Sequence, residues 1–157
     1  MTKAPEIQLA VLSIHHDFDA PIQRVFEAFT DPHKMSQWFF GYPGGSAKVE
    51  NELVVGGKYR IEMIHPSKQL ADSKDSCDSP VHYGEYLEID PPKRLRFTWI
   101  NDGFVSYSEV AIEFQSIDTG TRIHLAHKLP ADLQSIHQEG WNACFSNLRI
   151  ALSERKI

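Results

Sequence analysis

Apolar and polar residues alternate through the middle of the chain in the pattern of strands with one dry face. Strict alternation covers residues 58–63, 94–99, 108–114 and 121–127. The apolar members of these segments are Tyr59, Ile61, Met63, Leu95, Phe97, Trp99, Val110, Ile112, Phe114, Ile123 and Leu125. The opposite positions mix Lys and Arg with Glu, as expected of a solvated face with cross-strand pairs. The periodicity predicts an antiparallel sheet with one buried face.

Two less regular strands are expected beside these four. Residues 7–16 alternate, with Leu9 and Val11 on the apolar parity. Residues 83–90 also suit a strand, but Glu85 shares the parity of its apolar residues, so the pattern leaves the inner face open. Two turn sequences are expected to join neighbouring strands into hairpins: Asp90-Pro91-Pro92 and Asp118-Thr119-Gly120.

Two short helices are predicted between the first strand and the sheet region. Asp19 precedes Pro21 by two residues, a combination typical of a capped helix start. The apolar residues that follow at helical spacing are Val25, Phe26 and Phe29. Asp31-Pro32 ends this run and can begin a second short helix that carries Met35 and Trp38.

From about Ala131 the apolar period changes to 3.6 residues, which predicts a long helix over residues 131–153. The stripe comprises Leu133, Ile136, Gly140, Trp141, Cys144, Phe145, Leu148, Ala151 and Leu152. A stripe of this length must pack against a long apolar surface, and the buried face of the predicted sheet is the surface that this chain offers. The expected class is α+β, with a curved sheet of about six or seven strands wrapped around the C-terminal helix.

Length and composition are those of one globular domain, residues 1–157. Hydrophobic residues make up 41% and charged residues 24% of the chain. The net charge of −5 opposes attraction to phosphate, so we expect no nucleic-acid partner. No apolar run is long enough for a membrane span, and the N-terminus lacks the pattern of a signal peptide. Two cysteines cannot form a disulfide framework, and a cytoplasmic protein is expected.

The order of these elements, with particular residues in place, resembles the START-like (SRPBCC) superfamily and its helix-grip fold. Within it, the chain resembles the branch related to activators of the 90-kDa heat-shock chaperone ATPase. The matching residues are Ala20-Pro21, Val25-Phe26, Thr30-Asp31-Pro32, Trp38, Gly56-Gly57-Lys58-Tyr59, Gly84 to Pro92, Leu95, Phe97-Thr98-Trp99, Gly120-Thr121-Arg122, His137, Gly140-Trp141 and Leu148. The resemblance covers roughly residues 8–153. It implies the fold far more specifically than a function, because the superfamily includes binders, transporters and enzymes.

Two features of this sequence differ from those of the family that it resembles. The polar segment between His65 and His82 is longer than the short link expected there. Its composition predicts a mobile segment that partly covers a pocket mouth. Eukaryotic chaperone activators also carry a separate N-terminal domain. Since the first strand is expected at about residue 7, that domain is expected to be absent.

An apolar ligand pocket is predicted between the inner sheet face and the long helix. The expected wall residues are Trp38, Phe39, Tyr59, Met63, Phe97, Trp99, Val110, Ile112, His127, Trp141 and Phe145. Each tryptophan can equally be an ordinary core ring. His127 follows the inner parity of its strand, so its ring points toward the helix. It either satisfies a core partner or orients a ligand, and the pattern leaves both open.

Metal, cofactor and catalytic sites find little support in the sequence. His15 and His16 are consecutive in an extended segment, so their rings face opposite sides. No metal-binding motif, nucleophile elbow or phosphate loop occurs. Cys144 lies on the apolar stripe, where a thiol is usually a small core group. We expect no metal, no cofactor and no catalytic residues.

Three functional hypotheses remain. The leading one is a module that binds an apolar or aromatic small molecule. The second is a regulator of a chaperone or stress-response protein through a surface near Trp38 to Tyr42, as the family branch suggests. The third is a cyclase- or dehydratase-like enzyme that uses the same cavity, which would require a titratable group such as His127 or Tyr59 at its opening. A homodimer is left open.

Overall fold

The computed structural model describes residues 8–40, 45–64, 81–101, 107–155 and 157. The segment 66–81, for which mobility is predicted, lies outside the described residues except for its last residue. In the described part of the chain, eight strands form one sheet in the order β1-β8-β7-β5-β4-β3-β2, and β6 pairs with β4. The strands are β1 (Leu9–Phe18), β2 (Ser46–Asn51), β3 (Lys58–Ile64), β4 (Val81–Asp90), β5 (Arg94–Thr98), β6 (Ile100–Asn101), β7 (Glu109–Ile117) and β8 (Gly120–Pro130).

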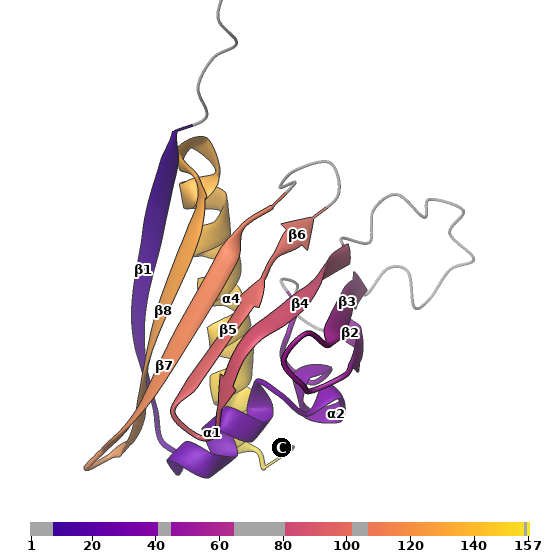
Figure 1. The fold of residues 1–157 in the computed structure, drawn as a ribbon. Helices are drawn as coiled ribbons and strands as arrows, with labels where there is room; N and C mark the ends of the chain where they lie inside the picture. Colours follow the sequence, from indigo (N-terminus) through magenta and orange to yellow (C-terminus); the bar gives the residue numbers. More distant parts are fainter. Residues whose placement is uncertain (1–7, 41–44, 65–80, 102–106, 156) are drawn as a thin grey trace, which may run out of the picture.

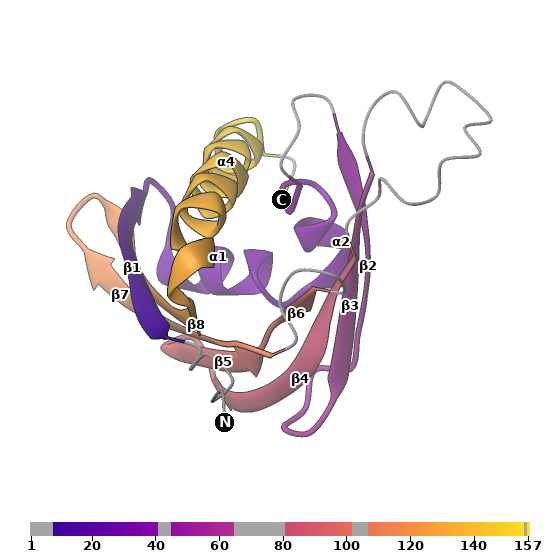
Figure 2. The same cartoon turned by 90° about the horizontal axis from the view of Figure 1, so that it is seen from above.

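Every strand pairing is antiparallel, and the sheet curves around the helices. Figure 2 shows α4 and the two short helices inside the curve, with β1 and β2 at opposite edges of the sheet. The helices are α1 (Ile22–Ala28), α2 (Pro32–Met35) and α4 (Gln134–Ser153), the last preceded by a 3-10 turn, η2 (Ala131–Leu133). In Figure 1, α4 runs along the inner face of the sheet. The predicted α+β class and the long C-terminal helix are confirmed.

The inner sheet face is the one that the alternation predicts for β3, β5, β7 and β8. Leu95, Ile112 and Leu125 are each 1% exposed or less, and they lie opposite one another in the registers of β5 with β7 and β7 with β8. The alternation did not locate two of the described strands, β2 and β6, and β6 is only two residues long. Periodicity cannot be recognised in so short a strand.

The apolar parity of β1 differs from the prediction. Leu9 and Val11 are 58% and 57% exposed, whereas Leu12 and Ile14 are buried. Leu12 pairs with His127 across the strand boundary, so the even-numbered positions of β1 continue the inner face of β8. A strand that carries apolar residues on both parities does not reveal its inner face, because a shift of one residue exchanges the two.

Ile136 was predicted to lie on the buried stripe of the long helix, and this is wrong. Its side chain is 63% exposed, while Trp141 is 3% exposed. Five residues separate the two, which places them about 140° apart around an α-helix. The stripe is buried from Trp141 onward, through Cys144, Phe145, Leu148, Ala151 and Leu152.

Helix α1 does not use the predicted cap. Its N-cap position is Pro21, with no side-chain hydrogen bond, and Asp19 is exposed. The backbone before the helix is held instead from β8, where Thr121 Oγ1 donates to the carbonyl oxygen of Ala20 at 2.7 Å. The chain therefore enters α1 from a fixed turn rather than through a capping carboxylate.

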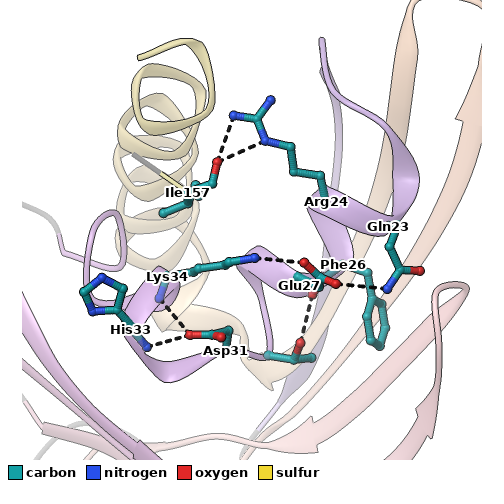
Figure 3. A network of polar contacts seen from close by, with 9 residues as sticks. Gln23, Arg24, Phe26, Glu27, Asp31, His33, Lys34 and Ile157 are labelled. Atoms are coloured by element: carbon teal, nitrogen blue, oxygen red, sulfur yellow. Dashed lines mark hydrogen bonds and ion pairs between the residues drawn. The ribbon is translucent and has the colours of Figure 1, made fainter. Parts of the chain in front are cut away.

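Helix α2 begins as predicted at Asp31-Pro32. The Asp31 carboxylate accepts hydrogen bonds from the backbone amides of His33 and Lys34. Lys34 also forms an ion pair of 2.8 Å with Glu27 of α1, so the two short helices are joined at the surface (Figure 3). These contacts determine where the residues after α2 enter the core.

The C-terminal end of the described chain is held against α1. The Arg24 guanidinium donates to Ile157 O at 2.8 and 3.0 Å (Figure 3). It also donates to the carbonyl oxygen of Leu152 at 2.7 Å. One arginine thereby links the end of α4 to α1. Sequence patterns offer no signal for this contact because its partners are backbone oxygens more than 120 residues away.

Candidate functional site

A small apolar cavity lies between α2 and strands β3 to β5. It has a volume of about 10 Å³, room for roughly one water molecule. The lining residues are Phe29, Met35, Phe39, Tyr59, Ile61, Tyr86 and Phe97. Pockets that hold drug-sized ligands have volumes of roughly 300–1,000 Å³. In this conformation the side chains therefore fill most of the space between helices and sheet.

All eleven predicted wall residues are buried, at 8% exposure or less. Three of them, Phe39, Tyr59 and Phe97, line the cavity. Of the remaining eight, seven belong to the same hydrophobic core without lining the cavity, and His127 is a buried polar residue beside Trp141. Four lining residues were absent from the predicted wall: Phe29, Met35, Ile61 and Tyr86. Ile61 could have been found from its shared parity with Tyr59, whereas the open parity of β4 concealed Tyr86.

Aromatic rings continue from the cavity toward α4. The Phe39 ring is stacked on Trp99 with centroids 5.7 Å apart, and it meets Trp141 edge-on at 5.6 Å. Trp99 and Trp141 are 5.2 Å apart, and Phe145 follows Trp141 at 5.7 Å. Phe39 thus separates the cavity from a cluster of large rings under the helix.

The hydroxyls at the cavity already have partners. Tyr59 donates to the carbonyl oxygen of Thr98 at 2.5 Å, and the Tyr86 hydroxyl accepts from Asn51 Nδ2 at 3.0 Å. Burial raises the pKa of both phenols, that of Tyr59 well above its ordinary value. Both side chains are therefore neutral and present mainly ring surface to the cavity.

His127 takes part in a hydrogen-bond chain within the core. Trp141 Nε1 donates to His127 Nδ1 at 3.1 Å, so in the neutral ring the proton is on Nε2. That nitrogen donates to Ser108 Oγ at 2.8 Å, and the hydroxyl donates to the carbonyl oxygen of Trp99 at 2.7 Å. Burial lowers the pKa of His127 to about 3, with a smaller effect from His137 nearby. Both ring nitrogens are thus engaged by the protein itself.

His82, which the sequence did not single out, lies against the same tryptophan cluster. Its ring is stacked on Trp99 with centroids 4.3 Å apart, and its Nδ1 accepts a hydrogen bond of 3.2 Å from Asn101 Nδ2. Burial lowers its pKa to about 3, and His137 contributes less. The pairing of β4 with β6, in which His82 lies opposite Asn101, brings His82 to this place, and no local pattern indicates it.

A sequence profile of the family described as activator of Hsp90 ATPase homolog 1-like protein matches residues 19–153. The match covers well over half of the chain. The chain belongs to this family. No curated protein matches it significantly.

Solved structures similar to this family member agree on the fold. Protein CV1439 from Chromobacterium violaceum is 25% identical, with a TM-score of 0.76 over 89% of this chain and 94% of that one. Protein NE0264 from Nitrosomonas europaea is 21% identical, with a TM-score of 0.72 over 93% and 96% of the two chains. CalU16 from Micromonospora echinospora is 22% identical, with a TM-score of 0.63 over 94% and 78%. The fold is that of the START-like superfamily, whose members commonly bind ligands or regulate proteins.

Other features of this activator-homologue domain bear on the alternative functions. Trp38, Phe39 and Phe40 are 0%, 2% and 9% exposed, so these three residues form no apolar patch at the surface. Burial raises the pKa of the Cys144 thiol to about 12, which keeps it protonated. Catalysis gains no support from His127 or Tyr59, because both already bond to core partners.

The histidines of β1 do not gather into a metal-binding group in the described segments. His15 stacks on His124 at 4.2 Å on one face of β1, while His16 contacts Phe18 and Phe145 on the other. Among described residues, no group of three or more His, Cys, Asp or Glu side chains could hold a metal ion. None of the helices in that part of the chain has the length and hydropathy of a membrane span.

Proposed function

We propose that this protein is a binding module that holds an apolar or aromatic small molecule between the sheet and the helices it encloses. The supporting observation is the cavity, which is surrounded by rings and aliphatic side chains. Of its two hydroxyl groups, that of Tyr59 donates to Thr98 O and that of Tyr86 accepts from Asn51 Nδ2. An apolar ligand can therefore enter without breaking a protein hydrogen bond, and burial of its surface stabilises the complex by roughly 25 cal/mol per Å².

Ligand entry requires two wall residues to move, because about 10 Å³ holds no organic molecule. Met35 ends α2, a helix of only four residues, and Phe39 follows it in a short run of turns. Methionine is unbranched and adapts readily to a new shape. Displacement of the Phe39 ring would extend the cavity toward Trp99, on which this ring stacks. The site would thus be enlarged from the α2 side while the sheet keeps its register.

The proposal is tested with N-phenyl-1-naphthylamine, an uncharged probe whose fluorescence rises in apolar surroundings. Replacement of Ile61 by Phe fills the cavity and should weaken binding at least about tenfold, since Ile61 lines it. The matched control is Ile89→Phe, the same substitution at a half-buried residue of β4 that does not line the cavity. Its affinity should stay within about twofold of the parent.

Two results would contradict the proposal. One is that the parent protein binds no probe up to its solubility limit. The other is that Ile61→Phe and Ile89→Phe bind equally well. Native mass spectrometry of the purified protein provides an independent measurement, because a copurified ligand adds a defined mass. The same spectrum decides between a monomer and the homodimer.

Regulation of a chaperone or stress-response protein is the second candidate, and the family match favours it. For both candidate functions we propose a cytoplasmic location, where the free thiol of Cys144 would remain reduced. A purified 90-kDa chaperone whose ATPase rate is unchanged by a molar excess of this protein would eliminate that candidate.

A further inference from the structure

The three tryptophans of the core differ in one respect. Trp38 Nε1 donates to the carbonyl oxygen of Ala28 at 2.9 Å, and Trp141 Nε1 donates to His127 at 3.1 Å. Trp99 is 3% exposed, yet its Nε1 has no hydrogen-bond acceptor in the described structure. A buried donor without an acceptor is costly, and most proteins satisfy every such group.

The neighbours of Trp99 cannot supply the acceptor that it lacks. The His82 ring stacks on it, but His82 Nδ1 already accepts from Asn101, which leaves a protonated Nε2 in the neutral ring. Both nitrogens of His127 are engaged, as described above. The other stacked neighbour, Phe39, has no polar atom in its side chain. None of these three ring neighbours therefore offers a free acceptor to the indole N–H.

Among the described residues, no charged side chain is buried where it could stabilise an ionised ligand. The buried polar residues among those described are Thr30, His82, Thr98, Asn101, Ser108, Thr121 and His127, none of which is a Lys, Arg, Asp or Glu. Burial holds the pKa of both histidines at about 3, so neither supplies a positive charge at neutral pH. A carboxylate placed beside Trp99 would lose its hydration without gaining a counterion.

We propose that Trp99 Nε1 is the polar anchor of the ligand site, and that the ligand is an uncharged, largely apolar molecule with a carbonyl-type oxygen that accepts this hydrogen bond. The inference rests on the proposed ligand-binding function and specifies its ligand class. Phe39 connects the two places, because it lines the cavity and stacks on Trp99. Phe97 also lines the cavity, with its ring 6.4 Å from that of Trp99. A flat ligand that displaces Phe39 would bring its oxygen to the indole N–H.

Three naphthalene probes of similar size test the ligand class: 2-acetylnaphthalene, 2-ethylnaphthalene and 2-naphthoate. The ketone accepts a hydrogen bond, the hydrocarbon cannot, and the carboxylate is charged. For each protein we take the ratio of the ketone affinity to the hydrocarbon affinity, and we compare this ratio between the parent and Trp99→Phe. The two probes differ in water solubility, but this difference is the same for both proteins and cancels in the comparison. We expect the ratio to fall about tenfold in Trp99→Phe, while 2-naphthoate binds the parent weakest.

The matched control is Trp38→Phe, which removes an indole whose N–H already bonds to Ala28. Its ketone-to-hydrocarbon ratio should equal that of the parent. Indole N–H resonances of the ¹⁵N-labelled parent protein give a second readout that does not depend on the stability of Trp99→Phe. Addition of the ketone should move the Trp99 resonance downfield, while the hydrocarbon should not.

The outcomes separate this inference from the proposed function. If ketone and hydrocarbon bind and Trp99→Phe leaves their ratio unchanged, the binding module stands and the anchor is refuted. An N–H resonance that is insensitive to the ketone refutes the anchor as well and would point to a buried water as the acceptor. If none of the three probes binds, and N-phenyl-1-naphthylamine also fails, the proposed function and this inference fall together.

Discussion

Acidification from pH 8 to pH 5 should destabilise the fold through two buried histidines, His82 and His127. Both Nδ1 atoms accept hydrogen bonds, from Asn101 and from Trp141 respectively, so a proton added there would remove an acceptor from a buried donor. Burial lowers the pKa of each ring from 6.5 to about 3. The folded state therefore remains neutral at pH values where the unfolded chain binds protons.

The direction and size of the effect follow from proton linkage. Each histidine has a lower pKa in the folded protein than in the unfolded chain. Above pH 6.5 the ring is neutral in both states and does not reduce the unfolding free energy, whereas between pH 6.5 and pH 3 only the unfolded chain binds the proton, so the unfolding free energy falls as the pH falls. At pH 5 the unfolded chain binds nearly one proton more at each site, which costs about 2 kcal/mol per histidine and about 4 kcal/mol for the pair. This is a large share of the roughly 5–15 kcal/mol by which domains are stable.

Three further groups with shifted pKa values, His16, Asp17 and Glu27, also contribute to the dependence of stability on pH. The pKa of His16 is also lowered, mainly by burial and to a smaller extent by the positive charge of Arg149, so His16 adds to the loss of unfolding free energy at low pH. Hydrogen bonds from Arg122 and Lys34 lower the pKa of Asp17 and Glu27 from 3.8 and 4.5. The stability from these carboxylates is present above their ordinary pKa values and is lost only below about pH 4.5.

Urea unfolding, followed by tryptophan fluorescence at constant ionic strength, measures the dependence of the unfolding free energy on pH. His82→Gln and His127→Gln should each reduce the slope between pH 6 and pH 5 by nearly one proton, about 1.4 kcal/mol per pH unit. His33→Gln, which removes an exposed histidine of α2, is the matched control for the loss of one histidine. A parent stability that is constant or rises toward pH 5 would refute the reasoning, as would an unchanged slope in both variants.

Three further predictions concern helix packing and capping. Gly140→Ala should raise the unfolding free energy by about 1 kcal/mol, because this α4 position is exposed and an added Cβ meets nothing within 4 Å; a lower urea midpoint would contradict it. Trp141→Ala should cost about 3–5 kcal/mol, since the ring is 3% exposed and its N–H bonds to His127; a loss under about 1 kcal/mol would mean that α4 does not pack here. Asp31→Ala should cost about 1 kcal/mol through two lost amide bonds at the α2 N-terminus, with the thermal midpoint as the measurement.

The candidate site was only partly predictable from local patterns. The parity of β3 and β5 identified Tyr59 and Phe97, because a strand buried on one side must alternate. The same rule was ambiguous for β4, where buried His82, Gly84 and Tyr86 alternate with half-buried Tyr83 and Glu85. His82 and Tyr86 were therefore missed, although one stacks on Trp99 and the other lines the cavity.

The sequence by itself determined the α+β class, the inner parity of four strands, the α2 start at Asp31 and the buried stripe of α4 from Trp141 onward. These are local properties, since periodicity and capping depend on residues only a few positions apart. The tertiary structure alone decided that β1 turns Leu12 inward, because that choice depends on its register with β8. It also decided which hydrogen bonds the core tryptophans make. Residues distant in sequence provide acceptors for Trp38 and Trp141 and none for Trp99, and only packing brings such partners together.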